Sequence, residues 1–372
     1  MAAPARARVI ICCGSGGVGK TTTSAALAIR LARSGARVAV LTIDPARRLA
    51  DALSVGDIGN TAFPVPVPDL PPGAALHAMM LDSKRTFDDV VERFAGGADA
   101  RDRILRNHYY RFVSTRLAGA HEYMAMEKLY ELSSSGDYDL VVLDTPPSRH
   151  ALDFLAAPEK MVNLMDEGVM RWLVLPASRG GWRMIEKGSD ILAKVLRTML
   201  GERTITDIAE FFSAFQSLWE GFRQRSLDVR ELLRSPDTRF LLVTTPAPGA
   251  RAEALHFLEV LQRSHMPFGG FLINRCAVAP IHAGPPRFGP APANVPEPGY
   301  AAMIAALSEG PDRRRRLVAA QEGAIAELRA HAPGAAPIWR IPEMDEEVHD
   351  LAGLDLVGKY LPDATALAEV RP

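Results

Sequence analysis

A glycine-rich stretch near the N-terminus constrains this chain more than any other part of its sequence. Residues 9–22 read VIICCGSGGVGKTT, in which a short apolar run leads into a segment that fits the phosphate-loop pattern G-x-x-x-x-G-K-[ST] at every required position. Backbone N–H groups can wrap a triphosphate only where no Cβ stands in the way, which requires glycine. We therefore predict a nucleotide site formed by Gly14, Ser15, Gly16, Gly17, Val18, Gly19, Lys20, Thr21 and Thr22.

Two side chains of this loop have roles in the predicted chemistry. Lys20 supplies a positive charge for the β- and γ-phosphates, and the Thr21 hydroxyl can ligate Mg²⁺. The helix expected from about Thr21 to Ser34 points its N-terminus at the phosphates and closes at Gly35. The alternative is a glycine turn with an ordinary surface lysine.

Length and composition limit the number of domains, the kinds of partner and the cellular location that we expect. A chain of 372 residues predicts two domains or one domain with a large insertion, and a net charge of -1 gives no electrostatic case for nucleic acid or an anionic membrane. The three cysteines form no C-x-x-C, which favours a reducing compartment over a zinc clip or an iron–sulfur cluster. The apolar run before the glycines is too short for a signal peptide, and no uninterrupted apolar segment approaches the roughly 18 residues of a membrane span. We expect a soluble, cytoplasmic protein.

Two acidic residues follow buried strands of the predicted sheet. Residues 38–43 (VAVLTI) form a strand that ends at Asp44, and residues 140–143 (LVVL) form another that ends at Asp144. The carboxyl ends of parallel strands are where open α/β sheets bind ligands. We assign Asp44 to the attacking water and Asp144 to the water shell of the metal. For Asp44, capping of a helix begun at Pro45 is an equally good reading of the local sequence.

The segments after these two strands are candidate switches. A strand end rich in proline and hydroxyl groups beside a γ-phosphate can be ordered by that phosphate and released on hydrolysis. The predicted switch residues are Asp44, Pro45, Asp51, Asp144, Pro147 and His150.

Later segments complete the sheet. Strands are expected over residues 240–244, 268–273 and 338–341, and residues 56–75 read as a Pro/Gly-rich connection with little regular structure. Asn274 follows the second of these strands, where its amide can read adenine; the sequence INRCA lacks the N-K-x-D pattern of guanine readers, so we favour ATP over GTP. Residues 300–332 are predicted to be helical with a break near Gly310 and Pro311.

These elements predict an α/β fold with a doubly wound, mostly parallel sheet and an inserted helical subdomain. The ATPase core comprises residues 1–80, 136–158 and 236–372, and the insertions comprise residues 81–135 and 159–235. The second insertion is rich in methionine, so a groove for an apolar client is conceivable, although ordinary packing between helices is the favoured interpretation.

With these pieces placed, the chain resembles the ArsA family of ATPases, which includes the arsenical-pump ATPase and the ATPase that targets tail-anchored membrane proteins. The family motifs GKGGVGKTT, DPAHSLSDAF and DTAPTGHTLRFL correspond here to GSGGVGKTT, DPARRLADAL and DTPPSRHALDFL. The segments CCGSGGVGKTT and EYMAMEKL look most like an actinobacterial branch described as anion-transporting ATPases. The resemblance implies a dimer of deviant phosphate-loop ATPases that ATP closes face to face, with Asp44 positioning the water and Asn274 at the adenine.

Three departures limit this resemblance. The second loop residue of the family is a lysine that reaches the phosphates of the partner subunit, and Ser15 takes its place here. A cation supplied in trans is worth factors of roughly 10³ to 10⁵ in related enzymes, so a homodimer is expected to hydrolyse slowly. We hypothesise pairing with a paralogue that keeps the lysine. The arsenite-binding cysteines and the zinc-binding C-x-x-C of the family are also missing.

The sequence thus predicts a Mg²⁺-dependent ATPase that works as a homodimer or as a heterodimer with a paralogous ATPase. It would act on a hydrophobic client or a membrane protein, and not on nucleic acid. Two alternatives stay open: a nucleotide-gated binding module with negligible hydrolysis, and a positioning ATPase of the ParA/MinD kind. The long helical insertions argue against the latter.

Overall fold

A single mixed sheet organises the computed structural model of this chain, which describes residues 7–44, 46–95, 97–107, 110, 120–146, 155–157, 221–279, 289–290, 292, 296–334 and 336–370. The strand order is β3-β4-β2-β5-β1-β6-β7-β8. The strands are β1 (Val9–Cys13), β2 (Arg37–Thr42), β3 (Phe63–Pro64), β4 (Ala75–Met80), β5 (Leu140–Asp144), β6 (Thr238–Thr244), β7 (Phe268–Cys276) and β8 (Ile338–Pro342).

Strand β1 lies at the point where the order of the chain reverses. It pairs with β5 on one side and β6 on the other, and the described neighbours are parallel throughout except for the antiparallel pair β3–β4. The sheet is therefore doubly wound and mostly parallel, as predicted. In such sheets ligands bind outside the carboxyl ends of the strands at the reversal point, which here is the end of β1.

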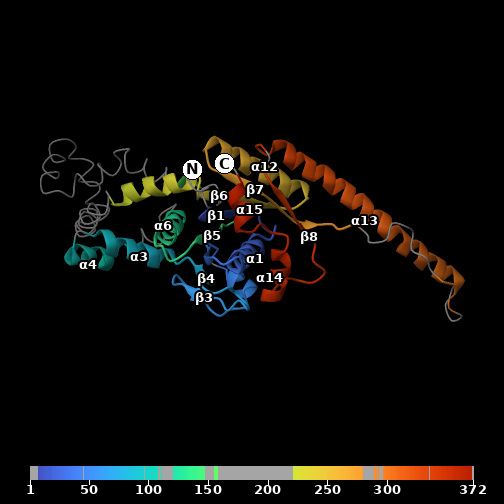
Figure 1. Cartoon of the computed structure of the whole chain (residues 1–372), viewed down its shortest axis with the longest axis horizontal. Helices are drawn as coiled ribbons and strands as arrows, with labels where there is room; N and C mark the ends of the chain where they lie inside the picture. Colours follow the sequence, from blue (N-terminus) through green and yellow to red (C-terminus); the bar gives the residue numbers. More distant parts are fainter. Residues whose placement is uncertain are drawn as a thin grey trace, which may run out of the picture.

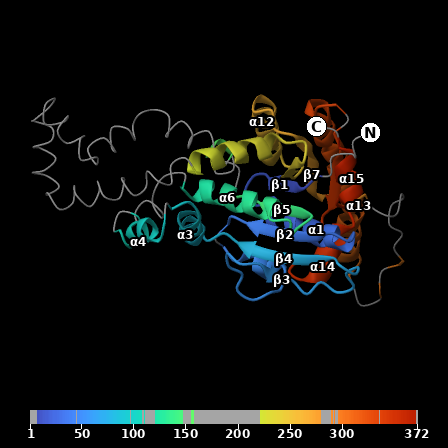
Figure 2. The same cartoon turned by 60° about the vertical axis from the view of Figure 1, so that its left-hand side comes forward.

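Helices cover both faces of the sheet (Figures 1 and 2), and each face carries its own hydrophobic core. Alternate residues of each strand point to opposite faces, so that Ile10 and Cys12 join one core while Val9, Ile11 and Cys13 join the other. The first core is covered by α1 (Lys20–Arg33), α2 (Arg48–Ala52), α14 (Leu351–Gly358) and α15 (Ala364–Glu369). The second is covered by α6 (Ala120–Ser134), α12 (Pro248–Arg263), the helix over residues 221–234 and the C-terminal part of α13 (Glu297–His331).

A third core lies between helices beyond the sheet, where Figure 1 shows α3 (Ser83–Phe94) and α4 (Ala98–Arg106). Its buried residues are Phe87, Val90, Val91, Ile104, Tyr110, Tyr123, Met124 and Phe222. We call α3, α4, α6 and the helix over residues 221–234 the helical unit. Helix α6 belongs to two cores, because Met124 packs in the third core and Met126 packs on the sheet. The division into ATPase core and helical subdomain stays a prediction, since residues 158–220 lie outside the described part.

The sequence analysis missed one strand and made one wrong prediction of secondary structure. Strand β4 was not predicted, because its sequence ALHAMM contains none of the β-branched or large aromatic residues that favour strands; pairing with β2 holds it in the sheet. The break predicted near Gly310 and Pro311 is wrong, because α13 runs through both as one helix of 35 residues. An interior proline removes one N–H donor and crowds the carbonyl four residues earlier, but it does not end this helix. In the turn after Pro311, Arg314 Nε donates to the Val278 carbonyl at 3.1 Å.

The C-terminal segment forms two further helices, α14 and α15. Helix α15 is only six residues long, and Asp363 caps it by accepting a hydrogen bond from the Ala366 N–H at 2.9 Å. Within the described residues, no helix combines the length and the apolar character needed to cross a membrane.

Candidate nucleotide-binding site

The loop over residues 14–19 joins the end of β1 to the start of α1, as predicted. A Cβ atom on Gly14 would lie 2.1 Å from the Val243 carbonyl oxygen of β6. Gly19 has φ +90°, and a Cβ atom there would lie 2.4 Å from Asn274 Nδ2 of β7. Neither position has room for a side chain, so the neighbouring strands require glycine at both ends of the loop. The loop main chain therefore packs directly against β6 and β7.

Lys20 begins helix α1 and is buried, with 8% of its surface exposed. Its Nζ atom donates to the Ser15 carbonyl oxygen at 2.8 Å. Burial lowers the pKa of Lys20, and the nearby Asp144 carboxylate acts in the opposite direction. The lysine therefore sits within the loop with a charge that a bound polyanion would stabilise.

Asp144 ends β5 and is completely buried beside the start of α1. Its Oδ2 atom accepts hydrogen bonds from Thr21 Oγ1 at 2.8 Å and from Thr42 Oγ1 at 3.0 Å. Burial raises the pKa of Asp144 to about 6, although the two threonine hydrogen bonds and the Lys20 charge oppose that shift. Thr21 and Asp144 are the two residues predicted to hold the metal. The fold thus brings their side-chain oxygen atoms into direct contact.

Thr42 connects this pair to the other acid. It is the last residue of β2, and its hydroxyl oxygen also accepts the Asp44 N–H at 3.3 Å. The Ile43 N–H donates to the Asp144 carbonyl oxygen at 3.1 Å. The main chain that carries Asp44 is therefore attached to the strand end that carries Asp144.

The Asp44 side chain also makes local contacts. Its Oδ1 atom accepts from the Ala46 N–H at 3.0 Å, and its Oδ2 atom accepts from Arg48 Nη1 at 3.2 Å. Helix α2 begins only at Arg48, so Asp44 holds a turn and does not cap a helix at Pro45. Its side chain stays 20% exposed at the end of the strand, where a water molecule can reach it.

Asn274 lies on β7 against the phosphate loop. Its Nδ2 atom donates to the Val18 carbonyl oxygen at 2.8 Å, and its Oδ1 atom accepts from the Arg275 N–H at 2.9 Å. The amide therefore supports the loop directly. Reading of adenine by this amide stays a prediction.

The remaining predicted residues divide into three groups. Thr22 lies half-buried in α1, and Gly16 and Gly17 lie in the loop, with Gly16 exposed. Asp51 is an exposed residue of α2, and its described contacts are with its own turn. Pro45, Pro147 and His150 lie outside the described residues.

Sequence reasoning missed two residues of the site. Thr42 binds both acids, and Ser24 Oγ lies 3.5 Å from Asp144 Oδ1. The available signal for Thr42 was a lone hydroxyl in the apolar run VAVLTI, directly before an acid. For Ser24 it was the spacing of three residues from Thr21, which places both hydroxyls on one face of α1.

Comparison with known proteins identifies the family. The family model described as Anion-transporting ATPase matches residues 7–279 of this chain, which include the phosphate loop, both acids and Asn274. The chain belongs to this ATPase family. The resemblance to ArsA-type ATPases is thereby confirmed.

Individual relatives of the anion-transporting ATPase family agree with this assignment. The chain is 25% identical to ATPase GET3B of Arabidopsis thaliana over 70% of its own length and 62% of that protein. It is 27% identical to putative arsenical pump-driving ATPase 1 of Aquifex aeolicus over 64% of its own length and 56% of that protein. It is 28% identical to ATPase GET3 of Podospora anserina over 68% of its own length and 78% of that protein. The first two matches span less than two thirds of those relatives.

Proposed function

We propose that this member of the anion-transporting ATPase family is a Mg²⁺-dependent ATPase in which ATP binding and hydrolysis open and close a dimer. The observation that carries the proposal is the Thr42 hydroxyl, which binds Asp144 on one side and the Asp44 main chain on the other. This arrangement supplies an acid for the metal and an acid for the water at the mouth of one phosphate loop.

The donor set fits ATP and Mg²⁺. A Cβ atom on Gly14 or Gly19 would clash with the Val243 carbonyl oxygen or with Asn274 Nδ2, so glycine lets the loop main chain lie against β6 and β7. The main-chain N–H groups of such a loop can bind phosphate oxygens. The Thr21 hydroxyl and, through water, the Asp144 carboxylate are hard oxygen donors of the kind that Mg²⁺ prefers. Bound Mg²⁺ neutralises charge on the phosphates.

The residues of the chain then have distinct tasks in hydrolysis. Lys20 and the loop N–H groups bind the phosphate oxygens as negative charge shifts toward the leaving diphosphate. Asp44 orients a water whose oxygen bonds to the γ-phosphorus while the bond to the bridging oxygen breaks. The products are ADP and inorganic phosphate.

We further propose that the second subunit is a paralogous ATPase that carries a lysine at the position of Ser15. The side chain of Ser15 has no charge to place on a neighbouring subunit's phosphates. Ser15→Lys is therefore expected to raise ATP turnover of the homodimer roughly 10-fold or more, while Ser15→Ala leaves it unchanged. Equal rates for Ser15→Lys and the wild type would contradict this part of the proposal.

The partner on which the dimer acts is proposed to be a hydrophobic client or a membrane protein, contacted through the helical unit.

Metalloid transport is not part of the proposal. All three cysteines are buried, and burial raises the pKa of Cys12 to about 12 and that of Cys276 to about 11. Thiols of this kind supply little of the thiolate that a soft metalloid needs.

Single-turnover hydrolysis by the wild type and by Lys20→Ala tests the activity. Loss of the buried lysine is expected to lower the hydrolysis rate by roughly 10² to 10³. Lys359→Ala, at an exposed residue after α14, is the matched control and should hydrolyse at the wild-type rate. Equal background rates in all three proteins would instead favour a nucleotide-gated binding module.

A further inference from the structure

We propose that His121 is a positioning residue that fixes the peptide unit bearing Asp44 and connects it to the helical unit. His121 is the second residue of α6 and is half-buried. Its Nε2 atom lies 3.3 Å from the Ile43 carbonyl oxygen, and its Nδ1 atom lies 2.5 Å from Ser83 Oγ. The imidazole thus bridges the end of β2 and the first residue of α3.

The Ile43 carbonyl assigns one proton of the ring, the one on Nε2. A main-chain carbonyl can only accept, so Nε2 must carry a hydrogen and donate it to Ile43. In the neutral ring, Nδ1 is then an acceptor, and the Ser83 hydroxyl donates to it. Both ring nitrogens are therefore used, and the orientation of the imidazole is determined from two sides.

The Ile43 carbonyl belongs to the peptide unit that continues into Asp44. A peptide unit is planar and rigid, so fixing its C=O and its N–H fixes the whole plane. Here His121 binds the C=O, while the hydroxyl of Thr42 accepts the Asp44 N–H at 3.3 Å. If either contact is lost, the plane can rotate and move the Asp44 carboxylate relative to the phosphate loop.

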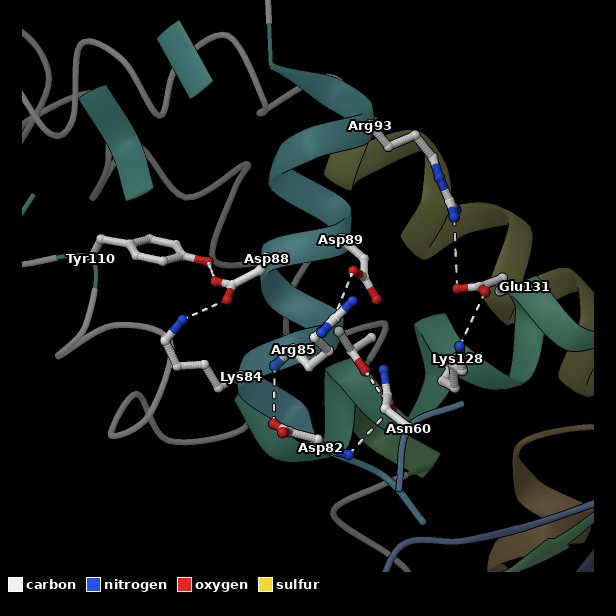
Figure 3. Close-up of polar contacts among 11 residues, drawn as sticks. Asn60, Asp82, Lys84, Arg85, Asp88, Asp89, Arg93, Tyr110, Lys128 and Glu131 are labelled. Carbon is white, nitrogen blue, oxygen red and sulfur yellow. Dashed lines mark hydrogen bonds and ion pairs between the residues drawn. The ribbon is translucent and has the colours of Figure 1, made fainter. Parts of the chain in front are cut away.

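The other end of the bridge is Ser83, at the start of α3. Hydrogen bonds of Asp82 and of Asn60, which lies before β3, hold this helix start (Figure 3). Asp82 caps α3 by accepting from the Arg85 N–H at 3.0 Å. The buried Asn60 Oδ1 accepts from the Asp82 N–H at 3.2 Å and from Thr86 Oγ1 at 3.1 Å. Ser83 is therefore part of a rigid helix start, and its contact with His121 transmits any displacement of α3.

Helix α6 extends this connection into both cores. Met124, three residues after His121, packs in the core of the helical unit, and Met126 packs against the sheet. A partner that shifts α3 or α6 would thus move the Asp44 peptide unit through His121. By reciprocity, a nucleotide that selects one position of Asp44 would bias the helical unit.

The inference rests on the proposed function, in which Asp44 orients the water, and the experiment separates the two. Hydrolysis and ATP affinity are measured for full-length wild type, His121→Ala, His121→Gln and Asp44→Asn. The control is His256→Ala, an exposed histidine of α12. His121→Ala is expected to lower kcat roughly 10- to 100-fold while the Kd for Mg·ATP stays within about 2-fold, because the acid is misplaced and the phosphate loop is intact.

His121→Gln keeps an N–H donor for the Ile43 carbonyl, so it should recover most of the lost rate. Ser83→Ala removes only the anchor of the ring and should lower kcat roughly 3- to 10-fold, which provides a readout even if His121→Ala folds poorly. Amide hydrogen exchange at the start of α3 should slow when Mg·ATP is added to the wild type. It should not slow in the double variant that carries both His121→Gln and Ser83→Ala.

Wild-type kcat in His121→Ala or Ser83→Ala would overturn the inference, as would a loss of kcat matched by an equal loss of ATP affinity. If Asp44→Asn is inactive while His121→Ala is fully active, only the positioning role fails. If Asp44→Asn hydrolyses ATP at the wild-type rate, the proposed function fails, and the role of His121 fails with it.

Discussion

Thr42 donates a hydrogen bond from its hydroxyl to Asp144 Oδ2 at 3.0 Å, and the same hydroxyl oxygen accepts the N–H of Asp44 at 3.3 Å. One side chain therefore connects the Asp144 carboxylate to the main chain of Asp44. Thr42 is buried, with 1% of its surface exposed. The geometry of the acids depends on a residue that has no charge and no reactive group.

Thr42→Val keeps the size and the β-branching of this residue and removes only the hydroxyl. We expect ATP turnover to fall roughly 10-fold and the free energy of unfolding to fall by about 1.5–3 kcal/mol, as for loss of a buried hydrogen bond to a charged group. Steady-state kinetics and chemical denaturation measure the two effects. Thr42→Ser retains the hydroxyl and should stay close to the wild type; equal defects in both variants would contradict the role assigned to the hydroxyl.

Asp144 predicts an unusual pH dependence of stability in the nucleotide-free protein without Mg²⁺. Burial raises the pKa of Asp144 from 3.8 to about 6, so between these values the folded state holds a proton that the unfolded state has lost. Protonation therefore stabilises the fold, and this contribution is present at low pH and lost as pH rises through about 6. Relative to Asp144→Asn, which cannot titrate, the wild type should gain roughly 2 kcal/mol as pH falls from 7 to 4.

Denaturant unfolding of the wild type and Asp144→Asn, carried out across this pH range, measures the difference. A difference that does not change with pH would show that the carboxyl titrates at its ordinary pKa. Asp345→Asn, at an exposed residue after β8, controls for the general effect of removing one carboxylate.

Asn274→Ala distinguishes support of the loop from reading of adenine. If the amide acts mainly through its hydrogen bond to the Val18 carbonyl, its loss should weaken ATP, GTP and inorganic triphosphate by a similar factor, roughly 5-fold for one hydrogen bond. If it acts by reading the base, only ATP should weaken. Competitive binding of the three ligands decides between these results.

Glu127 tests the packing of two helices of the helical unit, α6 and the helix over residues 221–234, against each other. This residue of α6 is 1% exposed, and its Oε2 atom lies 3.1 Å from Arg225 Nε, which is an ion pair without the alignment of a hydrogen bond. The Arg225 guanidinium also lies 4.2 Å from the centre of the Tyr130 ring. Removing one member of a buried pair leaves an uncompensated charge, so Glu127→Ala should cost about 3 kcal/mol of unfolding free energy.

The matched variant is Glu131→Ala on the same helix. Glu131 is 31% exposed and pairs with Lys128 at 3.1 Å, so its removal should cost less than about 1 kcal/mol. Thermal and denaturant unfolding compare the two variants. Equal costs would mean that solvent reaches Glu127 as easily as it reaches Glu131.

The doubly wound, mostly parallel sheet could be predicted because buried parallel strands are continuous apolar runs, and an acid that ends such a run is recognisable from sequence alone. Strand β4 could not be predicted from the sequence. Its residues, ALHAMM, have little preference for a strand, and pairing with β2 keeps them extended. In the site, glycines, Lys20 and Asp144 carry strong signals because few residue types can replace them. Thr42 and His121 carry weak ones, because their roles depend on partners that the chain brings near only when it folds.

Calorimetric titration of the folded protein with Mg·ATP tests the central claim, which is that the loop after β1 binds a triphosphate. We predict saturable binding to the wild type and to Lys359→Ala, and loss of roughly 10² in affinity or more for Lys20→Ala. Absence of any binding to folded wild-type protein, or equal binding to Lys20→Ala, would contradict it.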